Sequence, residues 1–259
     1  MTVLYFFILI LGLCVGSFIN CLVWRLNKKK TILGRSMCPK CKKKISWYDN
    51  IPVLSFFILR GRCRYCHKSI SLQYPAVEII IGVLFVLALY NHQANNWLLV
   101  ADFWLLIRNL FFISILTVIF IYDLRWYLIL DIITVPAMIV ALILNLFLEY
   151  PLQNLFLAAV IGAGFFLFQY IISRGKWIGG GDIRMGALMG FMLGYPGVIT
   201  GLMLSYIFGS IIGIILLIAG RKKMSSQIPF GTFLSAATII TLLYGQKILV
   251  WYMNLAYLQ

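Results

Sequence analysis

The chain has 259 residues, of which 63% are hydrophobic and 11% are charged. Soluble globular domains carry about 25% charged residues, so this composition excludes a water-soluble enzyme or binding module. A net charge of +15 would suit a nucleic-acid-binding protein, but the basic residues are concentrated. Thirteen of the 22 Lys and Arg residues lie between residues 25 and 68, and basic loops mark the cytoplasmic side of membrane proteins. We therefore expect the lipid bilayer as a partner and no nucleic acid.

Apolar runs of about 20 residues, the length of a helix that crosses the bilayer, recur along the chain. Placing the basic loops inside predicts about eight spanning helices and an amino terminus outside the cytoplasmic membrane. These helices are expected near residues 3–24, 76–90, a run ending near 122, and 132–148, 155–173, 183–193, 198–219 and 230–249. The predicted fold is an all-α polytopic membrane protein with a first helix (1–24), a cytoplasmic segment (25–75) and a membrane core (76–259).

Four cysteines form two C-x-x-C pairs in the basic cytoplasmic segment. The first pair is Cys38 and Cys41, and the second is Cys63 and Cys66. Twenty-one residues lie between Cys41 and Cys63, a spacing typical of tetrahedral zinc sites. A reducing cytoplasm disfavours the alternative, which is a pair of disulfides. Because the segment is too short and too basic for a hydrophobic core, a bound metal would supply its folding energy. The sequence predicts a structural Zn²⁺, since four cysteine ligands leave no position for a reacting water.

Seven carboxylates are available for acid-base chemistry: Asp49, Glu78, Asp102, Asp123, Asp131, Glu149 and Asp182. The predicted topology places two of them outside, one in the cysteine segment, and Glu78 at a helix start, where the helix dipole alone explains a carboxylate. Asp123, Asp131 and Asp182 remain. All three are expected at cytoplasmic ends of spanning helices, where an ionisable group is a candidate for function.

Two neighbouring carboxylates share one proton, and such a dyad activates water to cleave a peptide bond. Asp182 paired with Asp123 or with Asp131 would form one. The alternative, in which these acids cap helices or pair with Arg125 and Arg184, stays open on the residues alone.

Three consecutive glycines, Gly179, Gly180 and Gly181, precede Asp182. Glycine adopts backbone conformations that other residues avoid and lets a second segment approach closely. We therefore expect a sharp bend before Asp182 and a close contact with another part of the chain.

Several motifs resemble, in the same order, those of prepilin peptidases, a branch of the G-x-G-D intramembrane aspartyl proteases. G-G-G-D at residues 179–182 fits the G-x-G-D signature. The other matching segments are Gly16-Ser17-Phe18-Ile19-Asn20, Arg25-Leu26, Cys38-Pro39-Lys40-Cys41, Trp47, Asn50-Ile51-Pro52, Gly61-Arg62-Cys63, Tyr74-Pro75 through Glu78, Asp123, Asp131, Pro136 and Pro229-Phe230-Gly231.

The resemblance implies that Asp123 and Asp182 are the catalytic pair and that Asp131 and Glu78 support the site together with residues 179–181. The chain departs from the family at Leu130, where proline is usual. The implied reaction removes the basic leader of type IV prepilins or pseudopilins, after a glycine, at the cytoplasmic face of the bacterial inner membrane. Many members also methylate the new amino terminus with S-adenosylmethionine, although this chain has no glycine-rich loop that we can assign to the donor.

A cation-coupled transporter is the alternative from another class of protein. Its paired acids would bind a cation, and its zinc domain would dock a partner. Such transporters more often place the ionisable site near the bilayer midplane and contain repeated halves. The sequence shows neither feature.

Overall fold

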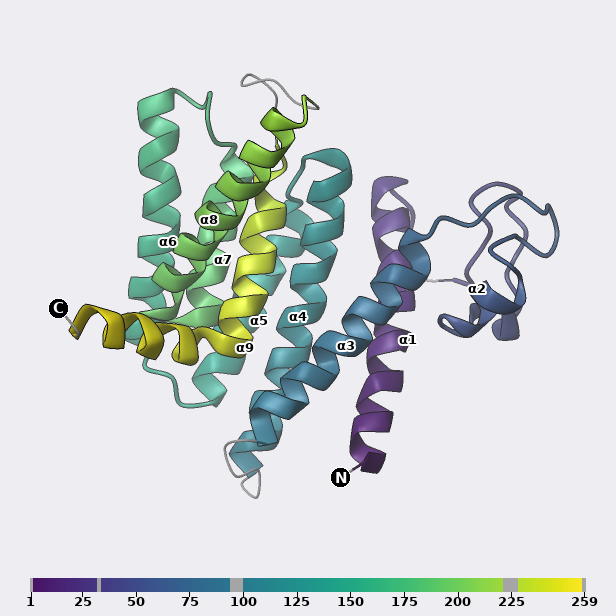
Figure 1. Cartoon of the computed structure of the whole chain (residues 1–259), viewed down its shortest axis with the longest axis horizontal. Coiled ribbons are helices and arrows are strands. Elements are labelled where there is room, and N and C mark those ends of the chain that lie inside the picture. The colour runs from purple at the N-terminus through teal and green to yellow at the C-terminus, as the bar shows by residue number, and fades with distance from the viewer. Residues whose placement is uncertain (1, 32–33, 94–99, 221–227, 258–259) are drawn as a thin grey trace. The chain divides into compact units, whose positions relative to one another are not determined.

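The computed structural model describes residues 2–31, 34–93, 100–220 and 228–257, and it is helical throughout its larger elements (Figure 1). The chain divides into two compact units, Met1–Leu99 and Val100–Gln259. Each unit is described on its own below.

Unit 1 contains two long helices, α1 (Thr2–Asn27) and α3 (Gln73–Gln93), which pack directly against each other. Glycines let the two backbones approach. A Cβ atom added at Gly12 would lie 2.7 Å from the Cα of Gly82, and one added at Gly16 would lie 2.6 Å from the Cα of Glu78. Small residues at such a crossing replace side-chain packing by backbone contact, as in other membrane helix pairs.

The segment between α1 and α3 holds two short elements, η1 (Trp47–Asn50) and α2 (Leu54–Ile58). Within its described residues, 28–31 and 34–72, Cys38 is the only buried hydrophobic side chain. The segment therefore lacks a hydrophobic core, as the sequence predicts, and its folding must depend on other interactions.

Unit 2 is a bundle of six helices: α4 (Val100–Trp126), α5 (Asp131–Phe147), α6 (Leu152–Ser173), α7 (Gly180–Leu193), α8 (Gly197–Ile218) and α9 (Phe230–Tyr257). The short helix α7 is central, since it contacts α5, α6, α8 and α9 and fully buries Met185 and Leu188. A Cβ atom at Gly186 would overlap the backbone at Gly162 of α6. Gly186 therefore allows close packing of α7 against α6.

Among the residues that the structure describes, six helices are long and apolar enough to cross a membrane: α1, α3, α4, α6, α8 and α9. The expectation of eight spanning helices is not confirmed, because α5 has 17 residues and α7 has 14. At 1.5 Å per residue, α7 is about 21 Å long, which is shorter than the roughly 30 Å of hydrocarbon in a bilayer. Two loops on which the predicted topology depends, 94–99 and 221–227, lie outside the described residues.

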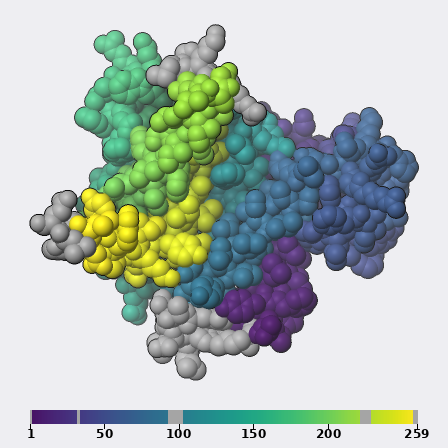
Figure 2. Space-filling model, viewed as in Figure 1, coloured from purple at the N-terminus to yellow at the C-terminus, as the bar shows by residue number. Residues whose placement is uncertain are grey.

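The outer surface of unit 2 is apolar along its long helices. On α8, which lies at the front in Figure 2, Ile207, Ile211 and Ile215 are between 46% and 57% exposed. In water this surface would drive aggregation, whereas in a bilayer it faces hydrocarbon. The chain is a multi-pass membrane protein, and lipid is the solvent of these helices.

Candidate active site and metal centre

Asp123 lies in the last turn of α4 and is only 4% exposed. Its Oδ2 atom accepts a hydrogen bond of 2.8 Å from the backbone amide of Thr232, and the amide of Gly231 also donates to this carboxyl group. Both amides belong to the first turn of α9, where backbone N–H groups have no partner within the helix. The positive end of the α9 dipole therefore stabilises charge on Asp123.

Gly231 has no room for a side chain. A Cβ atom there would lie 2.9 Å from Oδ2 of Asp123 and 2.9 Å from Cδ1 of Ile129. Real Cβ contacts are longer than this, so any larger residue would push the carboxyl group away from the α9 amides.

If Asp123 has the catalytic role that the resemblance implies, Gly231→Ala is expected to lower the rate of leader removal by about 10²-fold, the cost of misplacing a reacting group by about 1 Å. The measurement is initial rate per folded enzyme. Gly164→Ala is the matched control, because an added Cβ meets nothing within 4 Å there. Equal rates for the two variants would contradict the assigned role of Gly231.

Asp182 is the third residue of α7. Its Oδ2 atom accepts a hydrogen bond of 3.1 Å from the amide of Gly179, so the carboxyl group caps the start of its own helix. The charges of Asp182 and Asp123 interact electrostatically. Asp182 also interacts electrostatically with the hydroxyl group of Tyr206 on α8.

Ile129 packs between the turn of α7 that carries Asp182 and the first turn of α9, which binds Asp123. A Cβ atom at Gly181 would lie 3.0 Å from Cβ of Ile129, while one at Gly231 would touch the other end of the same side chain. Ile129 is only 9% exposed, so its side chain is buried against both turns. The structure thus brings the turn of Asp182 and the α9 turn that binds Asp123 to a single apolar residue.

The expected sharp bend at the three glycines is wrong. Gly179 is extended, with φ −82° and ψ 158°, and α7 already begins at Gly180. None of the three has a positive φ. The expected close approach occurs only at Gly181, whereas a Cβ at Gly180 would meet nothing within 4 Å. The absence of a side chain therefore matters at Gly181 because of packing, not because of backbone conformation.

Asp131 begins α5 and forms an ion pair of 2.8 Å with Arg184 of α7. Both side chains are substantially exposed, 56% for Asp131 and 42% for Arg184. Exposed pairs of this kind contribute about 0.2–1 kcal/mol to stability. Asp131 therefore pairs with Arg184, which is the alternative that the sequence left open. The carboxyl group that interacts with Asp182 is that of Asp123.

Glu78 lies in unit 1 and is 6% exposed. Because α3 begins at Gln73, Glu78 is in the second turn, and the helix dipole alone does not explain it. Its Oε2 atom accepts a hydrogen bond of 2.7 Å from the amide of Val53, and the hydroxyl group of Ser17 also bonds to it. This correction makes Glu78 a link between α1, α3 and the segment before α2.

The four cysteines of the sequence prediction come together in unit 1. The Sγ atoms of Cys38, Cys41, Cys63 and Cys66 all lie within 4.8 Å of one another, and those of Cys38 and Cys66 are 4.0 Å apart. Tetrahedral zinc with Zn–S bonds of about 2.3 Å places its sulfurs about 3.8 Å apart. The arrangement fits one four-thiolate ion, with no position left for a reacting water.

Each C-x-x-C pair lies in a similar short turn, here called a cysteine hairpin. The amide of the first cysteine bonds to the carbonyl five residues later, from Cys38 to Lys43 at 3.0 Å and from Cys63 to Lys68 at 3.0 Å. The residue after each second cysteine has a positive φ. Sequence analysis missed this repeat, although the shared pattern C-x-x-C-x-K was present.

In the second cysteine hairpin, backbone amides stabilise the thiolate of Cys63. Burial disfavours the Cys63 thiolate, but hydrogen bonds from the amides of Cys66 and Tyr65 outweigh it and lower its pKa to about 7. Beside it, Asp49 accepts hydrogen bonds of 2.6–3.1 Å from the guanidinium of Arg64, which raises the pKa of Arg64. A cation at the four sulfurs would complete this stabilisation of thiolate charge.

Models of known protein families match residues in both units. Residues 10–92 match the Bacterial Peptidase A24 N-terminal domain, and residues 110–218 match the Type IV leader peptidase family. A "Prepilin leader peptidase/N-methyltransferase" of Legionella pneumophila is 31% identical over 97% of this chain and 95% of its own length. The chain belongs to the Type IV leader peptidase family.

Other prepilin leader peptidase/N-methyltransferases agree with this assignment. The protein of that name from Myxococcus xanthus is 34% identical over 82% of this chain, which spans 63% of that relative. The one from Bacillus subtilis is 29% identical over 95% of this chain and 97% of its own length. No solved structure matches the chain. The N-terminal family match covers all four cysteines and Glu78, and the leader peptidase match covers Asp123, Asp131 and Asp182.

Proposed function

We propose that this chain is a prepilin peptidase that removes the leader of type IV prepilins or pseudopilins, with Asp123 and Asp182 as the catalytic pair. The observation that carries the proposal is that Ile129 packs against both the α7 turn of Asp182 and the α9 turn that binds Asp123, and that the two carboxyl groups interact electrostatically. The names of the relatives, which describe leader peptidases of prepilins, supply the substrate class.

The two aspartates take different parts in the reaction. The α9 amides stabilise negative charge on Asp123, so Asp123 is the base that takes a proton from the attacking water. Asp182 then holds the shared proton and donates a hydrogen bond to the scissile carbonyl. The water oxygen bonds to the carbonyl carbon, the C–N bond breaks, and the leaving amine receives a proton from the pair.

The site belongs at the cytoplasmic face of the bacterial inner membrane. Arg125 and Arg184, on the helices of the two aspartates, and the basic segment of residues 25–68 favour that side by the positive-inside rule. The amino terminus then lies outside. A prepilin leader is basic and is followed by an apolar helix, so its cleavage site also lies at this edge of the bilayer.

Zn²⁺ at the four cysteines is structural in this proposal. The cysteine hairpins supply its ligands, and the bound ion replaces the hydrophobic core that the described residues of this segment lack. The relatives' names include an N-methyltransferase activity, so methylation of the new amino terminus is the second proposed function.

Leader removal tests the proposal directly. The full chain is reconstituted in lipid with a pilin-like precursor, and the product is identified by mass spectrometry. We expect a cut directly after the glycine that precedes the apolar helix. A chain that carries its zinc yet leaves the precursor intact would refute the peptidase assignment. The comparisons offer no support for the transporter alternative. That alternative would require both an uncleaved precursor and cation-dependent uptake.

A further inference from the structure

The short helix α2 carries an apolar face that the described residues of the chain leave uncovered. Leu54, Phe57 and Ile58 have the spacing of neighbours on one side of a helix, and each is between 60% and 72% exposed. Trp47, on the neighbouring η1, is exposed as well. Large apolar side chains that gather on a surface in this way mark an interaction site.

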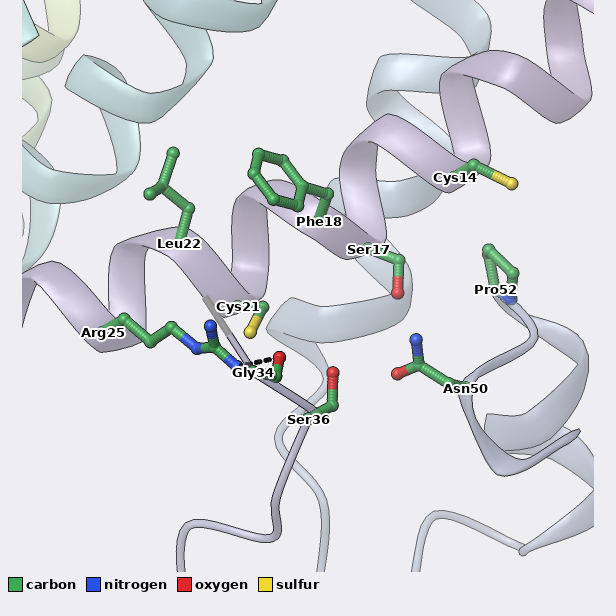
Figure 3. Close-up of a pocket in the computed structure, with 10 residues that line it drawn as sticks. All are labelled: Cys14, Ser17, Phe18, Cys21, Leu22, Arg25, Gly34, Ser36, Asn50 and Pro52. Carbon is green, nitrogen blue, oxygen red and sulfur yellow. Dashed lines mark hydrogen bonds between the residues drawn. The ribbon is translucent and has the colours of Figure 1, made fainter. Parts of the chain in front are cut away.

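The chain that leads into α2 lies beside the middle of α1 rather than beyond its end. Asn50 and Pro52 line a small cavity together with Cys14 and Ser17 of α1 (Figure 3). Ser17 is ten residues from the end of α1 at Asn27, which corresponds to about 15 Å at 1.5 Å per residue. The start of α2 is therefore held well within the length of a membrane helix.

The length of α1 places this level inside the hydrocarbon. Helix α1 has 26 residues and is about 39 Å long, about 9 Å more than the hydrocarbon of a bilayer. If all of that excess projected beyond the end at Asn27, Ser17 would still lie about 6 Å inside the hydrocarbon boundary. Tilting the helix would place Ser17 deeper. A segment held at this level meets lipid on every side that protein does not cover.

The backbone at both ends of α2 has hydrogen-bond partners within the protein, as a segment in contact with lipid requires. The amide of Val53, which precedes the helix, donates to Oε2 of the buried Glu78 at 2.7 Å. After the helix, the amide of Gly61 donates to the carbonyl oxygen of Phe56 at 2.9 Å. Water is therefore not needed to satisfy these groups.

The segment around α2 is strongly basic. Twelve of the thirteen Lys and Arg residues between positions 25 and 68 are exposed, and the one acid among them, Asp49, is bound by Arg64. The basic leader of the proposed substrate would be repelled by this charge, whereas anionic lipid headgroups attract it. An apolar face with exposed aromatic and basic residues is typical of segments that lie in the membrane interface.

We propose that α2 is a membrane-docking element. Leu54, Phe57 and Ile58 insert among the acyl chains of the leaflet at the Asn27 end of α1, and the surrounding Lys and Arg side chains bind its anionic headgroups. The cysteine hairpins then lie on the membrane surface instead of projecting freely into water. This inference goes beyond the proposed function, because it concerns unit 1 alone and needs neither catalytic aspartate.

Photocrosslinking of the full chain in lipid nanodiscs tests the proposal. The photoreactive amino acid p-benzoylphenylalanine replaces Phe57, and irradiation joins it to the C–H bonds that it touches. We expect the peptide that contains position 57 to gain the mass of one phospholipid. Position 56 is the matched control, because Phe56 has the same side chain but packs against Gly61. Its adducts are expected to form within the protein.

Each variant must keep the hydrogen-exchange protection of α1 and α3, so that only folded chains are compared. Absence of a lipid adduct at position 57, or equal lipid adducts at both positions, would overturn the proposal. An adduct at position 57 to a precursor, to a second copy of the chain or to α4–α9 would assign the face to that partner instead. Leader removal is not part of the readout, so a failure of the peptidase assignment leaves this test intact.

A second measurement uses the unmodified chain. Hydrogen exchange of residues 54–59 is compared in nanodiscs of phosphatidylcholine and in nanodiscs that also contain phosphatidylglycerol. We expect the anionic lipid to slow this exchange by about fivefold or more, the effect of one basic side chain at an anionic surface. High salt should remove the difference. Equal exchange in the two lipids, or a difference that salt leaves unchanged, would contradict headgroup binding by this segment.

Discussion

Asp123→Asn and Asp182→Asn each reduce leader removal by about 10²–10⁴-fold, the usual contribution of a group that transfers a proton in the transition state. Asparagine keeps the size of the side chain and still accepts a hydrogen bond from the α9 or Gly179 amide, but it neither takes nor gives the proton. The measurement is the initial rate of leader removal in reconstituted lipid, with each variant normalised to its folded amount.

Asp131→Asn is the matched control for this pair. It removes the same charge at a helix end in the same unit, but the structure gives Asp131 an exposed ion pair with Arg184. We expect leader removal by this variant to stay within about fivefold of the unmodified chain, because such a pair contributes at most about 1 kcal/mol. A loss in Asp131→Asn as large as in Asp182→Asn would assign the dyad differently.

Loss of the metal proposed at the four cysteines is expected to unfold the segment that carries them. We expect removal of the proposed zinc with a chelator, or replacement of Cys63 by Ser, to unfold the segment between α1 and α3, because structural zinc supplies about 10–16 kcal/mol in small zinc domains and the described residues of this segment form no hydrophobic core. Hydrogen exchange followed by mass spectrometry reports the change: amides of residues 36–70 lose protection, while those of α6 and α7 keep it.

Cys14→Ser serves as the control for that experiment, since Cys14 is an exposed thiol on α1 that lies outside the four-cysteine cluster. Its zinc content stays at one ion per chain. Retained protection of residues 36–70 in a chain shown to contain no metal would mean that the cysteine hairpins fold without the ion.

The membrane fold and the four-cysteine cluster were predictable because they depend on strong local signals. A long apolar run in lipid forms a helix, which satisfies its own backbone hydrogen bonds. Two C-x-x-C pairs in a reducing compartment favour a single metal site. Helix number was less predictable. Hydropathy measures apolar character but not whether a helix is covered by others, so the apolar residues of α7 predicted a span where the structure has a short, central helix.

The candidate site was predictable in its acids but not in what surrounds them. Asp123 and Asp182 emerged from a short list of carboxylates and from the family motifs. The amides of Gly231 and Thr232, and the contact through Ile129, depend on tertiary packing between distant segments, which no local pattern encodes. Glu78 shows the same limit, because its partner Val53 is an apolar residue whose backbone, rather than its side chain, makes the bond.

The shortness of α7 has a consequence for the surrounding lipid. Asp182 sits at one end of a helix about 21 Å long, next to α5, which is also short for a span. Hydrocarbon adjusts to short helices by thinning, at a cost of fractions of a kcal/mol per ångström of mismatch. Because α7 is covered by its neighbours, it is α5 that meets the lipid, through exposed side chains such as Ile139 and Ile143. A bilayer thinned beside α5 would bring headgroups and water closer to the end of the bundle where α5 begins at Asp131. We therefore expect the rate of leader removal by the reconstituted chain to depend on the thickness of the host bilayer.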